Sequence, residues 1–149
     1  MRPPHPPSAA IGSADDIEQL FYEALREGDI EKLMALWADD DDIVCVHPDG
    51  ARVIGPRAIR ASFEAIFAQG TVNVQAENVR RVQTHASAMH NLVEHMQLMT
   101  PQGLRRGFLI ATNVYVKSVE GWRLVAHHAS PGANGERREQ AEAPPPMLH

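Results

Sequence analysis

Apolar residues follow a helical spacing at three places in the first half of the chain. In residues 13–28 they recur at i, i+3, i+4, i+7 and i+8, and Ser13 with Asp16 forms a capping signal, so we expect an amphipathic helix there. The same spacing predicts a second helix over residues 29–38 and a third over residues 55–70, which has Pro56 in its first turn. The apolar positions of these helices are Ile17, Leu20, Phe21, Ala24, Leu25, Ile30, Leu33, Met34, Trp37, Ile59, Phe63, Ile66 and Phe67.

Runs typical of β-strands occupy most of the remaining chain. Residues 43–47 and 52–54 flank the turn signal Pro48-Asp49-Gly50, which predicts a short hairpin. The breaks between the later runs are short enough for antiparallel hairpins. We therefore predict an α+β domain whose helices pack on one face of a curved antiparallel sheet. The four longer strands are expected at about residues 72–82, 86–99, 107–117 and 122–130.

The length and the placement of prolines predict one domain between two tails. A chain of 149 residues fits one domain, and 44% apolar with 22% charged residues is an ordinary globular composition. Eight of the 11 prolines lie before Ser13 or after Ser130, where they oppose regular structure. We expect disordered tails at residues 1–12 and 132–149 and a working domain over residues 13–131.

Charge and cysteine usage exclude several classes of partner. The net charge is −5, from 19 acidic and 14 basic residues, so no basic surplus favours nucleic acid. The single cysteine, Cys45, cannot form an intrachain disulfide, and the sequence contains neither a secretory signal nor an apolar run of membrane-spanning length. We expect a cytoplasmic protein with no membrane partner. No HxH, HExxH or CxxC spacing occurs, and the acidic run at residues 39–42 lacks spaced oxygen ligands, so no metal or cofactor is expected.

The order of these features resembles the NTF2-like superfamily, specifically its SnoaL-like branch. The resemblance covers residues 13–130 and rests on Gly28-Asp29, Trp37, Pro48-Asp49-Gly50, Gly55 and the closing run from Trp122 to Ser130. It implies a cone-shaped fold in which three N-terminal helices pack on a strongly curved antiparallel sheet around a pocket that is open at one end. Many members of the superfamily dimerise, and their activities differ widely, so function depends on the site.

The ketosteroid isomerases of this superfamily use a carboxylate base and a tyrosine oxyanion donor. Their matching positions here are His47 and Phe21, so the isomerase residues are not retained. Tyr22 points about 100° away from Phe21 around the helix and is a poor substitute. His47 remains the best candidate for a general base, because imidazole titrates near neutrality. The alternative is that His47 only braces the adjacent Pro48-Asp49-Gly50 turn.

Side chains of the last strand alternate between the two faces of the predicted sheet. His128 shares one face with Trp122, Leu124, Ala126 and Ser130, and His127 faces the other way, so only one of the two histidines can line a cavity. The resemblance favours His128, either as a second catalytic residue or in a structural hydrogen bond with Ser130. Alternation does not decide which face is concave. The expected pocket residues are Phe21, Trp37, Phe63, Met96, Asn113, Tyr115 and Ser130.

The sequence supports two functions of different classes. One is binding of a small apolar or amphipathic molecule in the cone, with cofactor-independent acid/base catalysis of the isomerase, cyclase, dehydratase or hydrolase type. The alternative is a non-catalytic association module, because the WxxxxxHxS pattern of Trp122, His128 and Ser130 resembles the association domain of calmodulin-dependent kinases. In both cases apolar residues on the two faces of the strands favour a homodimer formed by the outer face of the sheet.

Removal of residues 1–12 and 132–149 is expected to leave stability nearly unchanged, because these segments bury little apolar area. Thermal melts of the trimmed and full-length chains test this. A fall of more than about 5 °C, which corresponds to roughly 1 kcal/mol or more, would show that one of the segments docks on the domain.

Overall fold

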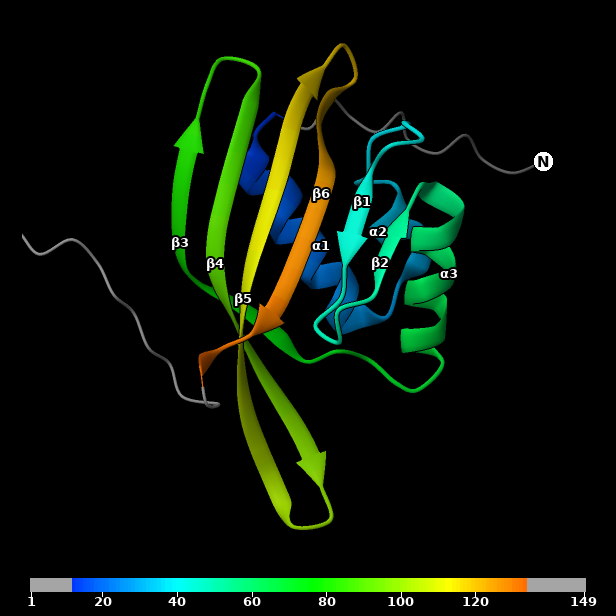
Figure 1. Ribbon diagram of the computed structural model, residues 1–149, viewed down its shortest axis with the longest axis vertical. Helices are drawn as coiled ribbons and strands as arrows, with labels where there is room; N and C mark the ends of the chain where they lie inside the picture. The colour runs from blue at the N-terminus through cyan, green and yellow to red at the C-terminus, as the bar shows by residue number, and fades with distance from the viewer. Residues whose placement is uncertain (1–11, 134–149) are drawn as a thin grey trace, which may run out of the picture.

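A computed structural model describes residues 12–133 of the chain, apart from the side chains of residues 99 and 100. Nearly all of both predicted tails lies outside these residues. Figure 1 shows a long curved sheet with helices on one side. The described elements are, in order, α1 (Ala14–Glu27), α2 (Ile30–Met34), β1 (Val44–Val46), β2 (Arg52–Ile54), α3 (Pro56–Phe67), β3 (Val74–Gln83), β4 (Ser87–Thr100), β5 (Gly103–Ser118) and β6 (Gly121–Pro131).

The six strands form one mixed sheet in the order β2-β1-β6-β5-β4-β3. The predicted α+β class is confirmed, but the sheet is not wholly antiparallel, because β1 pairs in parallel with β6, with Cys45 opposite His127. The prediction was wrong on this point because short turns reveal only the pairing of consecutive strands. β1 and β6 are separated by about 75 residues of chain, and no local signal specifies their pairing.

Three helices lie in the described part of the chain, but they do not all precede the sheet. α1 begins at Ser13, whose side chain accepts a hydrogen bond from the Asp16 amide, and ends at Gly28 with a left-handed φ of 67°. α3 follows the β1–β2 hairpin, as the residue ranges predicted from the sequence, so the three helices are not all N-terminal to the strands as the family resemblance implied. α2 ends at Met34 rather than near Trp37, because Trp37 leaves the helix to form a β-bridge with Leu124.

α1 lies behind the sheet, against its inner face (Figure 1). One broad side of the helix is buried there, and it includes polar as well as apolar residues. None of the described helices is long and apolar enough to cross a membrane. The buried residues of α1 are Ala14, Ile17, Glu18, Phe21, Tyr22, Ala24 and Leu25.

A β-bulge in β6 changes which residues face the interior. Val114 of β5 lies opposite Ala126, whereas the next residue, Tyr115, lies opposite Leu124, so Val125 is an extra residue without a partner on β5. An extra residue reverses the alternation of side chains beyond it. Trp122 and Leu124 therefore face inward before the bulge, and His127 and Ala129 face inward after it.

Candidate functional site

Four polar side chains meet above a part of the inner sheet face where two alanines lie side by side. Ala111 and Ala129 lie opposite each other on β5 and β6, and their methyl groups leave room above the sheet. The side chains that meet in this space come from one helix and three strands, and we refer to them as the inner network. The inner network consists of Tyr22 from α1, Glu94 from β4, Asn113 from β5 and His127 from β6.

The hydrogen bonds of the inner network form a chain that runs from His127 through Asn113 and Tyr22 to Glu94. His127 Nδ1 lies 2.5 Å from Asn113 Oδ1, which can only accept, so Nδ1 donates and Nε2 is left as an acceptor. Asn113 Nδ2 donates to the Tyr22 hydroxyl at 3.2 Å, and that hydroxyl donates to Glu94 Oε2 at 2.7 Å. His127 Nε2 faces the same Glu94 oxygen at 3.9 Å. Glu94 therefore receives one strong hydrogen bond and faces a second group that can accept a hydrogen bond.

The inner network lies at the edge of the closed interior. All four residues are no more than 5% exposed. Along the inner face of β4, however, burial decreases after Glu94, because Met96 is half-buried and Leu98 is 58% exposed. Glu94 is thus the last buried residue along this face of β4.

Burial controls the protonation of Glu94 and Tyr22. Loss of solvent raises the pKa of Glu94 to about 7, although the hydrogen bond from Tyr22 acts in the opposite direction. Burial, together with the charge of Glu94, raises the pKa of Tyr22 well above its usual value, so its hydroxyl stays neutral and acts as a donor. A carboxyl group with a pKa near neutrality can take up or release a proton under physiological conditions.

His127 is held in its neutral form. Burial lowers its pKa to about 3, and the charges of the neighbouring His47 and His128 contribute in the same direction. A phenyl ring, Phe21, packs at 5.0 Å from the imidazole centre and helps to exclude water. At neutral pH the site therefore combines a titrating carboxyl group with an imidazole that carries no charge.

His47 occupies the same side of the sheet but does not brace the turn with its side chain. Its Nε2 lies 2.9 Å from the Ser62 hydroxyl of α3, and that hydroxyl donates its proton to the Ile59 carbonyl. Ser62 can therefore only accept from Nε2, which leaves Nδ1 as the basic nitrogen. Burial lowers the pKa of His47. The backbone of His47, through bonds with Gly50 and Ala51, is the part that holds the turn.

The expectation that His128 and Ser130 line the interior is wrong. Both are exposed, and they contribute instead to a shallow depression of about 440 Å³ on the outer face of the sheet. The cause is the bulge at Val125, which turns His127 and Ala129 inward. Strict alternation, on which the prediction relied, does not hold through a bulge.

Tyr22 is the second correction. It was expected to point away from the site occupied by Phe21, yet both side chains are buried, with ring centres 5.1 Å apart. α1 lies so deep in the curved sheet that a residue 100° away around the helix still meets the inner face. Phe21 packs against His127, while Tyr22 supplies the hydroxyl.

The other predicted pocket residues separate into two groups. Phe63 lies beside Phe21 and His47, and Met96 lies on the open side of Glu94. Trp37 and Tyr115 lie beside Leu124, on the side of Asn113 that is away from Glu94. The structure therefore places Asn113 in the inner network and Phe21, Phe63 and Met96 near it, whereas Trp37 lies away from it and the Tyr115 hydroxyl reaches Glu18 instead.

Sequence reasoning missed Glu94, Tyr22 and His127 as a group. One signal was present, because Glu94 is a lone acidic residue between Leu92 and Met96 on one face of a long strand. A carboxyl group at such a position must find partners when the face is buried. Nothing in the sequence identified Tyr22 or His127 as those partners.

One known protein family matches most of the chain. The family model described as a SnoaL-like domain matches residues 15–134. The chain belongs to the SnoaL-like domain family. A comparison with functionally curated proteins found no match.

Solved structures similar to this SnoaL-like domain have several described roles. A candidate calcium/calmodulin-dependent protein kinase type II association domain from Thiobacillus denitrificans is 30% identical, with a TM-score of 0.76 over 83% of this chain and 98% of that chain. A candidate dehydratase of the NTF2-like family from Streptomyces avermitilis is 28% identical, with a TM-score of 0.70 over 78% of this chain and 91% of that chain. The CaMKII hub from S. rosetta shares the fold at 18% identity, with a TM-score of 0.65 over 87% of this chain and 99% of that chain.

The raised pKa of Glu94 predicts a pH dependence of stability. Because the folded-state pKa of about 7 exceeds the unfolded value of 4.5, the contribution of Glu94 is fully present below pH 4.5 and is lost as pH rises through 7. Relative to Glu94→Gln, the free energy of unfolding of the wild type is expected to fall by about 2–4 kcal/mol across this window. Urea unfolding of both proteins at several pH values measures the difference. A pH-independent difference would contradict the assignment.

Proposed function

We propose that this SnoaL-like domain binds a small, largely apolar molecule that carries a carbonyl or hydroxyl group, and that Glu94 exchanges a proton with it. The observation that supports the proposal is the Glu94 carboxyl group itself, buried at the boundary of the interior, hydrogen-bonded to Tyr22 and with a pKa of about 7. Buried titratable groups with strongly shifted pKa values are concentrated at functional sites. No cofactor takes part in this proton exchange.

The arrangement around Glu94 suits catalysis by proton transfer. In its ionised form the carboxylate can remove a proton from a carbon next to a carbonyl group. Once Glu94 has taken up the proton, the Tyr22 hydroxyl can shift its single hydrogen bond from the carboxyl group to the oxygen on which negative charge develops. Dehydration, isomerisation and cyclisation can each begin with this step. The similarity to a candidate dehydratase, at 28% identity, supports this class of reaction.

The apolar surroundings favour the same type of ligand. Phe21, Phe63 and Met96 lie beside the inner network and offer apolar contacts to the body of a ligand that enters from the Met96 side. In the proposal His47 faces the polar end of the ligand, with its unprotonated nitrogen as a second proton acceptor. Because the network is closed in this structure, binding requires side chains on the Met96 side to move.

Exchange of carbon-bound protons tests the proposal without a known substrate. A panel of small cyclic ketones is incubated with the protein in D₂O, and loss of the protons next to the carbonyl group is followed by NMR. Glu94→Gln keeps the shape of the side chain but removes its basicity, so exchange is expected to fall by roughly 10²–10⁴-fold. Tyr22→Phe removes the donor to the developing oxyanion and is also expected to slow exchange.

Two further variants make this experiment decisive. His128→Gln is the matched control, because His128 is exposed on the outer face and its substitution should leave exchange unchanged. His47→Gln should preserve ligand binding and lower turnover if His47 serves the ligand, whereas a purely structural role would lower stability by about 1 kcal/mol and leave affinity unchanged. Exchange that is equally fast in the wild type and Glu94→Gln would refute the role of Glu94.

A second function is favoured by the outer face of the sheet. Val44, Val46, Ile110, Val114 and Ala126 are half-buried there and line an open apolar depression. Contiguous apolar surface of this kind is typical of interaction sites. The similarity to a candidate association domain, at 30% identity, supports self-association through this face. The two functions are compatible, because they use opposite faces of the same sheet.

A homodimer formed through this face is the corresponding prediction. Ile110→Glu places a charge in the apolar depression and is expected to shift the protein to a monomer while its far-UV spectrum is preserved. Val119→Glu is the matched control, because Val119 is fully exposed in the β5–β6 turn. Sedimentation velocity at micromolar concentration measures both variants. A monomeric wild type would contradict the dimer, and a ring of many subunits would favour the association module.

A further inference from the structure

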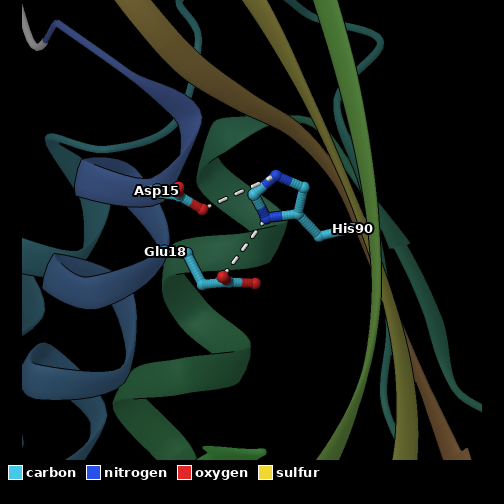
Figure 2. A group of neighbouring side chains, drawn as sticks. All are labelled: Asp15, Glu18 and His90. Carbon is cyan, nitrogen blue, oxygen red and sulfur yellow. Dashed lines mark ion pairs between the residues drawn. The ribbon is translucent and has the colours of Figure 1, made fainter. Parts of the chain in front are cut away.

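A second cluster of titratable side chains lies between the start of α1 and the inner face of β4, outside the inner network. Asp15 and Glu18, three residues apart, project from the same side of α1 toward His90. Figure 2 shows both carboxylates on one side of the imidazole ring, facing its two nitrogens. Glu18 Oε2 lies 3.2 Å from His90 Nδ1, and Asp15 Oδ1 lies 3.9 Å from Nε2.

His90 is unusual among the buried polar residues of the structure. Its side chain is 1% exposed, and neither ring nitrogen makes a hydrogen bond to any residue that the structure describes. A buried imidazole normally satisfies at least one nitrogen. The polar edge of the ring is instead aimed at two carboxylates that approach without good hydrogen-bond geometry. This arrangement leaves a lone pair on the ring and at least one oxygen of each carboxylate available to a shared ligand.

Neighbouring residues hold the two carboxylates in place. Arg81 Nε donates to Asp15 Oδ1 at 2.8 Å, and this is the same oxygen that faces His90. Asp15 Oδ2 is free of this contact. The Tyr115 hydroxyl lies 3.5 Å from Glu18 Oε1, so Glu18 Oε2 is the oxygen that faces His90. The Tyr115 ring also packs edge-on at 4.9 Å from the His90 ring. Outer partners of this kind orient ligands at metal sites.

We propose that Asp15, Glu18 and His90 bind one divalent transition-metal ion of the Zn²⁺ type. One ligand atom from each residue lies within 4.8 Å of the other two. Bonds of about 2.0–2.2 Å to the metal require donor atoms roughly 3.3–3.6 Å apart, so the widest separation in the cluster must contract by as much as about 1.5 Å when it binds the ion. Asp15 can supply that movement, because its side chain is 59% exposed.

The chemistry of the donors determines the class of ion. An imidazole nitrogen with two carboxylate oxygens suits Zn²⁺, Mn²⁺ or Fe²⁺, whereas Ca²⁺ and Mg²⁺ prefer oxygen ligands alone. The two carboxylates balance the charge of the ion when His90 is neutral. A groove of about 420 Å³ borders Asp15 and Glu18, so water has access to a remaining coordination position. Spacing motifs did not predict this site, because the third ligand lies on a strand 72 residues after Glu18.

Metal titration of the full-length chain tests this site. Protein freed of metal with EDTA is titrated with ZnCl₂ by calorimetry, and the wild type is expected to bind one equivalent with a Kd of roughly 1 μM or tighter. Asp15→Asn should weaken this binding by tenfold or more, while Asp16→Asn, the adjacent exposed carboxylate on the same helix turn, should leave it unchanged. The melting temperature of the wild type should also rise by about 5 °C or more when Zn²⁺ is in 100-fold excess over Kd.

His90→Gln should abolish both the binding and the thermal shift. If His90→Gln does not fold, Asp15→Asn and Glu18→Gln decide the matter, since Co²⁺ should produce visible ligand-field absorption in the wild type that both variants lose. Binding that is equal in Asp15→Asn and Asp16→Asn overturns the proposal. It is also overturned if the wild type binds neither Zn²⁺ nor Co²⁺. Neither outcome bears on Glu94, whose proton exchange is measured separately.

Discussion

The packing of α1 against the concave face of the sheet is the interaction on which the rest of the structure depends. One helix, with a diameter of about 10–12 Å including its side chains, covers much of the inner face. Its buried side is therefore wider than a simple apolar stripe, and it includes Glu18 and Tyr22 beside Ile17 and Phe21. Burial of those polar groups requires partners from the sheet. Both clusters described above arise from this requirement.

The two buried polar residues of α1 meet different hydrogen-bonding and ionic partners on the sheet. Tyr22 reaches Glu94 and Asn113 across the small side chains of the central strands, while Glu18 meets His90 nearer the start of the helix. Water is excluded from the inner network, and electrostatic interactions are stronger there than at the surface. That exclusion raises the pKa of Glu94 and keeps His127 neutral. The same packing thus creates the chemistry of the inner network and the unsatisfied imidazole of His90.

The sheet also separates two kinds of surface. Its inner face carries the titratable groups, and its outer face carries apolar residues such as Val44, Ile110 and Val114. A single extra residue in β6, Val125, decides which neighbouring histidine belongs to which face. His127 enters the inner network, and His128 remains exposed beside the apolar depression. Proton transfer on one face and self-association on the other are therefore compatible in one small domain.

The sequence by itself determined the local elements and the family. Helical spacing with capping at Ser13 predicted α1, and the turn at residues 48–50 predicted the β1–β2 hairpin. These signals depend only on residues that are neighbours in the chain. The order of features from Gly28 to Ser130 indicated a SnoaL-like fold. Phe63 and Asn113 were also among the expected pocket residues, and both are buried. Only the tertiary structure decided the parallel pairing of β1 with β6, the inward direction of His127 and the meeting of Tyr22 with Glu94. These features depend on a bulge, on the depth of a helix in a curved sheet and on contacts between residues 72 positions apart, and none of them leaves a periodic pattern in the chain.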